Sequence, residues 1–211
     1  MSLTEPPDPF DPAPEIIPAG SVLYRVHEQA LPSGERNDGT LFNPGFGRPS
    51  RFAFFGAPPT PALYAADSPE AAVHETILHD AEPGSFIPRV AWATKILTVV
   101  RVTADVRVAA FHSDGLRRFG LFPADLTDTD MTAYPRTVRW ARAAHIAGLA
   151  GVSYMCRHYN ASRAFCLFGD RVPAGVLVAE PGNPAARVFA LPEDAEWLAA
   201  LAASMRVVTR P

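Results

Sequence analysis

Cysteine is scarce in this 211-residue sequence. Its two cysteines, Cys156 and Cys166, lack CxxC spacing, and two are too few for a disulfide framework. The composition therefore excludes a disulfide-stapled scaffold and favours a reducing compartment. A metal site is not predicted either, because His74 and His79 lack the i,i+3 or i,i+4 helical spacing that would place them side by side as ligands.

Basic charge is also limited. The chain has 19 Lys and Arg residues against 22 Asp and Glu, a net charge of -3, and no basic run longer than the pair Arg117 and Arg118. Binding to a phosphate backbone needs a concentrated positive surface. We therefore expect no nucleic-acid partner.

Long apolar runs are missing as well. No stretch approaches the ~18 apolar residues of a membrane span. The N-terminal sequence MSLTEPPDPFDPAPEIIPAG has acidic residues and prolines where a signal peptide needs a basic start and an apolar run. We expect a cytoplasmic protein without membrane contact.

Proline, by contrast, is abundant, with 22 in the chain. Residues 1–20 are rich in it and have too few apolar side chains to pack alone, so they predict a flexible leader. Residues 21–211 are enough for one hydrophobic core and predict a single domain. Within it, residues 31–61 are dense in Gly, Pro, Asn and Ser and predict a long loop with one or two short strands.

Hydrophobic periodicity predicts both strands and helices. Residues 21–27 alternate as a strand that places Arg25 on the same face as Leu23 and His27. After a strand at 62–66, Ser68 as N-cap and Pro69 as first helical residue predict a helix to about residue 80. Further strands are predicted within 89–109, with a corner at 103–105, and at 151–156, 164–170 and 174–180, and further helices at 135–150 and 192–205. Without regular βαβ alternation, this order favours an α+β domain with a mixed, mainly antiparallel sheet flanked by helices.

Glu75 falls among small and apolar residues of the predicted helix. A buried carboxylate needs a partner, either as a structural ion pair with an arginine or His79, or as a charge that stabilises a cationic transition state. Arg25 on its strand and Arg51 in GRPSRFAFFG are candidate anion binders, with Arg48 as the alternative to Arg51. A guanidinium grips a phosphate or carboxylate by two parallel hydrogen bonds.

Two further places carry candidate residues. Tyr64 would either stack on a flat ring or lie in the core with its hydroxyl satisfied. In GVSYMCRHYN, the neighbourhood of Cys156, Arg157, His158 and Asn160 raises the hypothesis of a cysteine nucleophile. Sequence proximity does not establish the hydrogen bond that a Cys–His pair needs, so a cysteine hydrolase or transferase stays an alternative.

Four segments, taken in order, resemble the RES domain family, toxins of bacterial toxin–antitoxin pairs named for Arg, Glu and Ser motifs. They are LYRVH, GRPSRFAFFG, ALYAADSPEAAVHETILH and GVSYMCRHYNASRAFCLFGD, spanning about residues 20–171. The resemblance implies that Arg25 and Arg51 are the two family arginines, Tyr64 the tyrosine and Glu75 the glutamate.

The family's serine position falls on Cys156, followed by Arg157. This is a departure, because a thiol is a far weaker hydrogen-bond donor and acceptor than a hydroxyl. A catalytically silent RES-like domain that binds NAD+ or a protein partner is therefore the main alternative to an enzyme.

The resemblance implies a fold like that of ADP-ribosyltransferases and degradation of NAD+ at the nicotinamide–ribose bond, by phosphorolysis or hydrolysis. NAD+ would be the substrate, with inorganic phosphate as an open second substrate and no cofactor. Glu75 would stabilise the oxocarbenium-like ribose, while Arg25 and Arg51 hold phosphate groups and Tyr64 stacks beside the nicotinamide or its ribose. The same site would include Cys156.

Arg48, Arg157 and Asn160 are the remaining candidates for NAD+ binding. An antitoxin partner is implied by the family alone, with the 31–61 loop and the leader as expected binding places. The sequence leaves self-association open.

Overall fold

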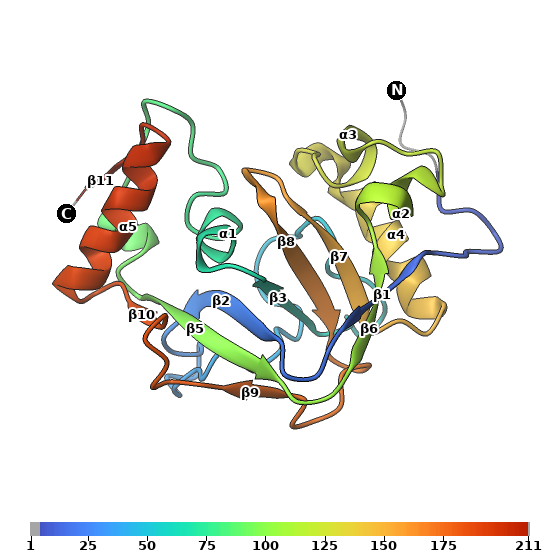
Figure 1. Ribbon diagram of the computed structural model, residues 1–211, viewed down its shortest axis with the longest axis horizontal. Coiled ribbons are helices and arrows are strands. Elements are labelled where there is room, and N and C mark those ends of the chain that lie inside the picture. Colours follow the sequence, from blue (N-terminus) through green and yellow to red (C-terminus); the bar gives the residue numbers. More distant parts are fainter. Residues whose placement is uncertain (1–4, 211) are drawn as a thin grey trace.

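The structure, a computed structural model, describes residues 5–210 (Figure 1). Its main sheet contains β1 (Pro14–Ile17), β2 (Val22–Glu28), β3 (Ala62–Ala66), β5 (Lys95–Val102), β6 (Val106–Ala110), β7 (Gly151–Cys156), β8 (Tyr159–Phe168), β9 (Leu177–Ala179) and β10 (Arg187–Val188). The helices are α1 (Pro69–His74), α2 (Ser113–Arg117), α3 (Pro123–Leu126), α4 (Tyr134–Ile146) and α5 (Pro192–Ser204), with 3-10 turns η1 (Arg89–Ala91) and η2 (Met131–Ala133). A small separate pair joins β4 (Phe86–Ile87) and β11 (Val208–Thr209) in parallel.

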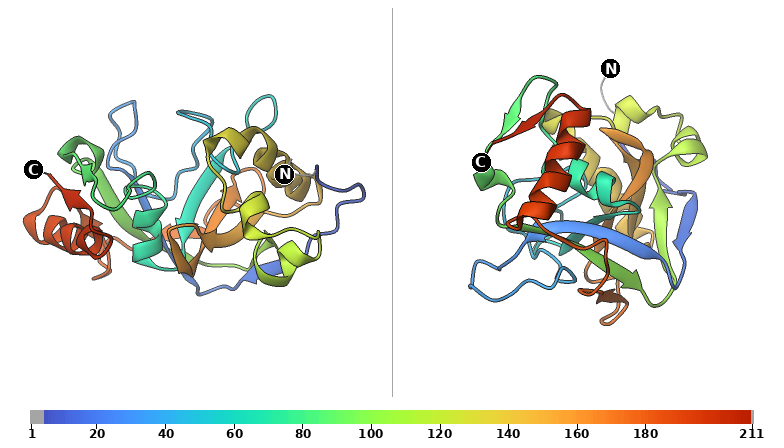
Figure 2. Two further views of the ribbon diagram at one scale, coloured as in Figure 1. Left: turned by 90° about the horizontal axis from the view of Figure 1, so that it is seen from above. Right: turned by 60° about the vertical axis from the view of Figure 1, so that its left-hand side comes forward.

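The main sheet is curled and has the strand order β1-β6-β7-β8-β3-β2-β5-β10, with β9 also paired to β5 (Figure 2). Its pairings are antiparallel except that of β6 with β7. Helix α1 lies over the middle of the sheet, α5 beyond the β5 and β10 end, and α2 to α4 near β6 and β7 (Figure 1). The α+β class with a mainly antiparallel sheet flanked by helices is confirmed.

Apolar side chains are buried on both faces of the sheet. In β3, Ala62 and Ala66 belong to a large cluster shared with the helices, whereas Leu63 and Ala65 belong to a second cluster on the opposite face. This is the two-residue alternation of a strand covered on both sides. The helices therefore occupy one face, where α1 brings Glu75 close to the sheet.

Strands β2 and β3 are neighbours that hardly pair. Strand β2 is matched to β5 from Val22 to Glu28, and β3 to β8 from Ala62 to Ala66. Between β2 and β3 themselves, the register consists of Tyr24 opposite Ala66. The strands diverge beyond this pair, and the chain from 31 to 61 lines the opening.

This long segment is a loop held by its own polar groups. In place of the short strands expected from the sequence, its described structure shows isolated bridges, such as Asn43 to Ala62. Gly39 lies against the sheet with a φ of +88°, where an added Cβ would approach His27 Nε2 to 2.7 Å. Glycine is needed there for both the backbone conformation and the close approach.

Helix α1 begins as the sequence predicts and ends earlier. Ser68 is the N-cap, accepting a hydrogen bond from the Ala71 N–H at 3.2 Å. The helix stops at His74, with Glu75 as C-cap, instead of reaching residue 80. The backbone N–H groups of residues 76, 77 and 78 all donate to the Val73 carbonyl, so the chain after the helix forms a tight turn.

Several other expectations need adjustment. The predicted strand region at 89–109 starts with the 3-10 turn η1, so its first strand begins at Lys95. The helix expected at 135–150 ends at Ile146, near Gly148 with a φ of +82°. The strand at 151–156 and the helix at 192–205 are confirmed to within one residue. Within residues 5–210, no helix combines the length and apolarity needed to cross a membrane.

The described part of the predicted leader is built into the domain. Strand β1 pairs with β6, and Ile17 at its end is buried. Phe10 stacks on Phe119 with ring centroids 5.1 Å apart and meets the edge of Trp140. These few apolar anchors explain the difference from the flexible leader expected from composition. Residues 1–4 of that leader lie outside the described residues.

A polar cluster fastens β1 to the sheet. Glu15 contacts His112 Nε2 at 2.9 Å, accepts a hydrogen bond from Ser153, and pairs with Arg163. Arg163 also pairs with Asp67, two residues before α1. Burial alone would raise the pKa of Glu15, but the hydrogen bonds from His112 and Ser153 and the nearby Arg163 lower it to about 2.

We expect Glu15→Gln to reduce the free energy of unfolding by about 2 kcal/mol at pH 7. Lowering the pKa of Glu15 from 4.5 to about 2 corresponds to roughly 3 kcal/mol at about 1.4 kcal/mol per pKa unit, and solvent screening around the partly exposed Arg163 reduces this value. The folded pKa lies below the usual 4.5, so the contribution is present above pH 4.5 and fades as pH falls towards 2. Urea unfolding at pH 7 and pH 3 measures it. Glu5→Gln, which removes an exposed partner of Arg139, is the control and should cost less than about 1 kcal/mol. A pH-independent difference for Glu15→Gln would contradict the prediction.

Candidate functional site

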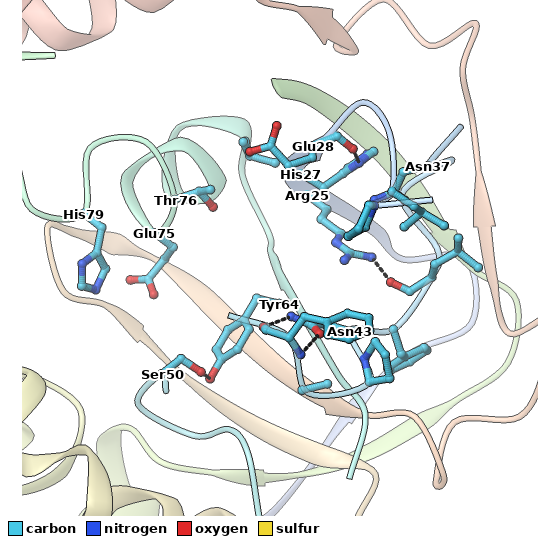
Figure 3. Close-up of a pocket in the computed structure, with 18 of the residues that line it drawn as sticks. Arg25, His27, Glu28, Asn37, Asn43, Ser50, Tyr64, Glu75, Thr76 and His79 are labelled. Atoms are coloured by element: carbon cyan, nitrogen blue, oxygen red, sulfur yellow. Dashed lines mark hydrogen bonds between the residues drawn. The ribbon is translucent and has the colours of Figure 1, made fainter. Parts of the chain in front are cut away.

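A cavity of about 790 Å³ occupies the opening between β2 and β3. Arg25 and His27 line it from β2, Tyr64 from β3, Glu75 from the end of α1, and the 31–61 loop from the side (Figure 3). Its volume falls in the range of small-molecule sites. The cavity therefore collects side chains from elements distant in the sequence.

Glu75 is held by two donors at the cavity wall. The Tyr154 hydroxyl donates to its Oε2 at 2.8 Å, and the Arg157 backbone N–H donates to its Oε1 at 3.3 Å. Arg51 Nη1 lies 4.0 Å from Oε2. The Glu75 side chain is 11% exposed. Since each carboxylate oxygen has a donor, its orientation is set while one edge remains accessible.

Arg51 is a buried cation beside this carboxylate. Its side chain is 3% exposed, and its guanidinium carbon lies 5.9 Å and 5.8 Å from the ring centroids of Tyr134 and Tyr154. Nη2 donates to the Thr129 carbonyl at 3.4 Å. Its buried Nε has no hydrogen-bond partner among the described residues. Arg51 thus has donor capacity left for an anion.

Arg157 approaches the same place from the solvent side. Its Nε pairs with Asp128 Oδ1 at 2.7 Å, and its Nη1 donates to the Thr129 carbonyl at 3.3 Å. Arg51 and Arg157 therefore share one backbone acceptor. The two guanidinium groups therefore lie near each other at the Thr129 carbonyl, and the Arg51 guanidinium is the one that pairs with Glu75.

Arg25 faces the cavity and secures the loop. Its Nη1 donates to the carbonyls of Gly39 at 2.8 Å and Leu41 at 2.7 Å. Burial lowers the pKa of Arg25 to about 10, against the opposing effect of Asp38, so it remains a cation at neutral pH. Burial likewise lowers the pKa of His27 to about 4. His27 is therefore neutral at pH 7.

Tyr64 also has a structural attachment. Its hydroxyl lies 2.8 Å from Ser50 Oγ and accepts the Phe52 N–H at 3.1 Å. Burial raises the pKa of Tyr64 well above its usual value. Its hydroxyl is thus used to hold the segment that carries Arg51, while the residue lines the cavity.

Four of the candidates are not among the residues that line the cavity: Arg157, whose backbone N–H nevertheless holds Glu75, and Cys156, Arg48 and Asn160. Cys156 is fully buried, and its sulfur donates towards the Ala71 carbonyl at 3.9 Å. Burial, with a further effect of Glu75, raises the pKa of the Cys156 thiol well above its usual value. This is the opposite of the shift that activates a thiol nucleophile. Arg48 and Asn160 are exposed and lie outside the residues that line the cavity.

Sequence reasoning assigned no role to Tyr154 or Tyr134. Both line the cavity, and Tyr154 contacts Glu75 directly. Tyr154 precedes Cys156 by two residues on β7, so strand alternation places both side chains on one face. That spacing was the available signal for Tyr154. For Tyr134, at the start of α4, we find no comparable signal.

The fold and the cavity together define an α+β domain with an anchored carboxylate and a buried arginine in a cleft of the sheet. A family model described as the RES domain matches residues 22–192. The chain belongs to the RES domain family.

Among solved structures, the chain is similar to a chain in the crystal structure of the M. tuberculosis MbcT–MbcA toxin–antitoxin complex. The TM-score is 0.53 at 20% sequence identity, over 78% of this chain and 84% of that one. This similarity concerns the fold. No curated protein matches the sequence.

Metal ligation finds no support in the part of the chain that the structure describes. There, no group of three or more His, Cys, Asp or Glu side chains is arranged to hold a metal ion.

We expect Cys156 to react slowly with iodoacetamide in the folded protein at pH 7. The raised pKa of its thiol leaves little thiolate, and burial blocks access. Mass spectrometry of timed samples measures the modification. The control is the guanidinium-unfolded protein, in which Cys156 and Cys166 should both be modified. Rapid, selective modification of Cys156 in the folded protein would revive the cysteine-nucleophile hypothesis.

Proposed function

We propose that this protein cleaves the nicotinamide–ribose bond of NAD+. The observation that carries the proposal is the Glu75 carboxylate, held by Tyr154 at 2.8 Å with Arg51 at 4.0 Å on the wall of the cavity. Family membership agrees with the chemistry, since the RES resemblance implies NAD+ degradation.

The reaction suits an oriented carboxylate. As the bond between ribose C1′ and the nicotinamide nitrogen breaks, its electron pair goes to nicotinamide, which leaves as a neutral molecule. Positive charge develops on the ribose, and Glu75 stabilises it. Attack by water at C1′ with loss of a proton gives ADP-ribose, and attack by inorganic phosphate gives its 1″-phosphorylated form.

The arginines supply anion binding in this proposal. Arg51, with its unpartnered Nε, binds a phosphate group next to Glu75, and the Arg157 guanidinium, which donates to the same Thr129 carbonyl as Arg51, adds positive charge nearby. Arg25 contributes positive charge from β2, and Tyr64 packs beside the nicotinamide or its ribose.

Arg48 and Asn160 are the weaker candidates for NAD+ binding because both lie outside the cavity lining. Cys156 would pack beside Glu75 as a weak hydrogen-bond donor and not as a nucleophile.

We also propose that the protein is the toxin of a toxin–antitoxin pair. Two findings support this: membership of the RES domain family and the likeness of the fold to a chain from a toxin–antitoxin complex. A protein antitoxin would then neutralise it.

Glu75→Gln should lower nicotinamide release from NAD+ by about a hundredfold or more, because the variant loses the charge that stabilises the ribose cation. Purified protein is incubated with NAD+, with and without inorganic phosphate, and products are resolved by chromatography and mass. Glu82→Gln, an exposed change outside the cavity, is the matched control and should retain the parent rate. If Glu75→Gln stayed within a few-fold of the parent, the assignment would be wrong.

A silent domain is the second candidate, because Cys156 replaces the serine expected from the family. In that case NAD+ would raise the melting temperature of the parent without any nicotinamide release, as ligand binding to the folded state requires. Absence of both effects would leave a protein-interaction role.

Expression of the parent in a bacterial host should deplete cellular NAD+ and arrest growth, and Glu75→Gln should do neither at equal protein level. Cellular NAD+ and colony counts measure the two effects. Growth arrest by both proteins with unchanged NAD+ would refute NAD+ cleavage as the toxic activity.

A further inference from the structure

The orientation of Glu75 raises the question of which side chain sets it. The groups that approach the carboxylate include the Tyr154 hydroxyl at 2.8 Å, the Arg157 N–H at 3.3 Å and the Arg51 guanidinium at 4.0 Å. Only the first is a short side-chain hydrogen bond. Its removal would leave Oε2 without its donor and allow the carboxylate to move towards Arg51.

Tyr154 is well suited to act as a fixed donor. It is fully buried in the middle of β7, and its ring packs against Phe52 with centroids 5.1 Å apart. Burial, followed by the effect of Glu75, raises the pKa of Tyr154 well above its usual value, so its hydroxyl keeps its proton at neutral pH. A buried, packed side chain loses little further freedom when it holds a partner.

Cys156 lies two residues further along the same face of β7, but the hydrogen bonding of its thiol differs from that of the Tyr154 hydroxyl. Burial, the negative charge of Glu75 and a side-chain hydrogen bond with Glu75 raise the pKa of the Cys156 thiol, and its sulfur also donates towards the Ala71 carbonyl at 3.9 Å. A thiol is a weak donor even at good distance. Of the two side chains on this face of β7 that reach Glu75, the Tyr154 hydroxyl is therefore the stronger donor and the Cys156 thiol the weaker one.

We propose that Tyr154 is the positioning residue that holds the Glu75 carboxylate in its working orientation. The kinetic part rests on the proposed function. The hydrogen bond between Tyr154 and Glu75 is independent of the proposed function.

Tyr154→Phe removes one oxygen and keeps the ring. We expect kcat for nicotinamide release to fall about tenfold to a hundredfold, with KM changed less than threefold, because substrate binding groups stay in place while the charge is misplaced. Tyr24→Phe on β2, outside the cavity, is the matched control and should leave both constants unchanged. A kcat for Tyr154→Phe within twofold of the parent overturns the proposal.

A second measurement needs no substrate. In protein with ¹³C-labelled glutamate side chains, the Glu75 carboxyl resonance is identified by its loss in Glu75→Gln. We expect it to shift in Tyr154→Phe and to stay in place in Tyr24→Phe. A fall in kcat with an unmoved resonance overturns the positioning role. If the parent releases no nicotinamide but the Glu75 resonance shifts in Tyr154→Phe, the proposed function is overturned while the contact between Tyr154 and Glu75 is supported.

If Tyr154→Phe fails to fold, 3-fluorotyrosine can be placed at position 154 and at no other position. This label keeps the hydroxyl and provides a ¹⁹F resonance. Its ¹⁹F resonance should shift when Glu75→Gln is added and stay in place with Glu82→Gln. If the ¹⁹F spectrum is the same with and without Glu75→Gln, the contact between Tyr154 and Glu75 is overturned.

Discussion

The single register pair between β2 and β3 is the constraint on which the rest of this structure depends. Each strand is fully matched to its other neighbour, so the sheet stays continuous while it opens between them. The opening must be lined, because unpaired backbone groups in a sealed interior are costly. The 31–61 loop does this, and Arg25 ties it in place through the carbonyls of Gly39 and Leu41. The cavity is thus a consequence of strand divergence.

Charge at the cavity follows from the same geometry. Glu75 sits at the end of α1, where the helix turns away and its side chain meets the sheet from above. A carboxylate this buried is tolerated because Tyr154 and Arg157 donate to it and Arg51 lies close by. Arg51 in turn depends on loop residues held by the Tyr64 hydroxyl. Loop, helix and sheet therefore stabilise one another through the site, which couples its chemistry to the fold.

Much of the local structure was predictable because it depends on neighbours in the chain. The cap at Ser68 and the strand at 151–156 are of this kind. The early end of α1 was not, since it depends on how the turn after Val73 packs. The anchoring of residues 5–20 was missed as well, because Glu15 gains its partners from residues about a hundred or more positions away. Composition measures the average character of a segment and misses a few well-placed contacts.

For the site, the sequence by itself determined the candidate residues: a glutamate that needed a partner, one arginine on a strand, a second arginine in a glycine-rich loop, and a tyrosine on a neighbouring strand. Residue chemistry and strand periodicity were sufficient for that. Only the tertiary structure decided which of them meet. It placed Arg51 beside Glu75 and brought the Tyr154 hydroxyl to the same carboxylate. It left Arg48 and Asn160 outside the cavity, and it used the Arg25 guanidinium partly for hydrogen bonds to the loop. Hydrogen bonds and ion pairs act over a few ångströms, and the pairing of strands remote in the sequence determines which groups come that close.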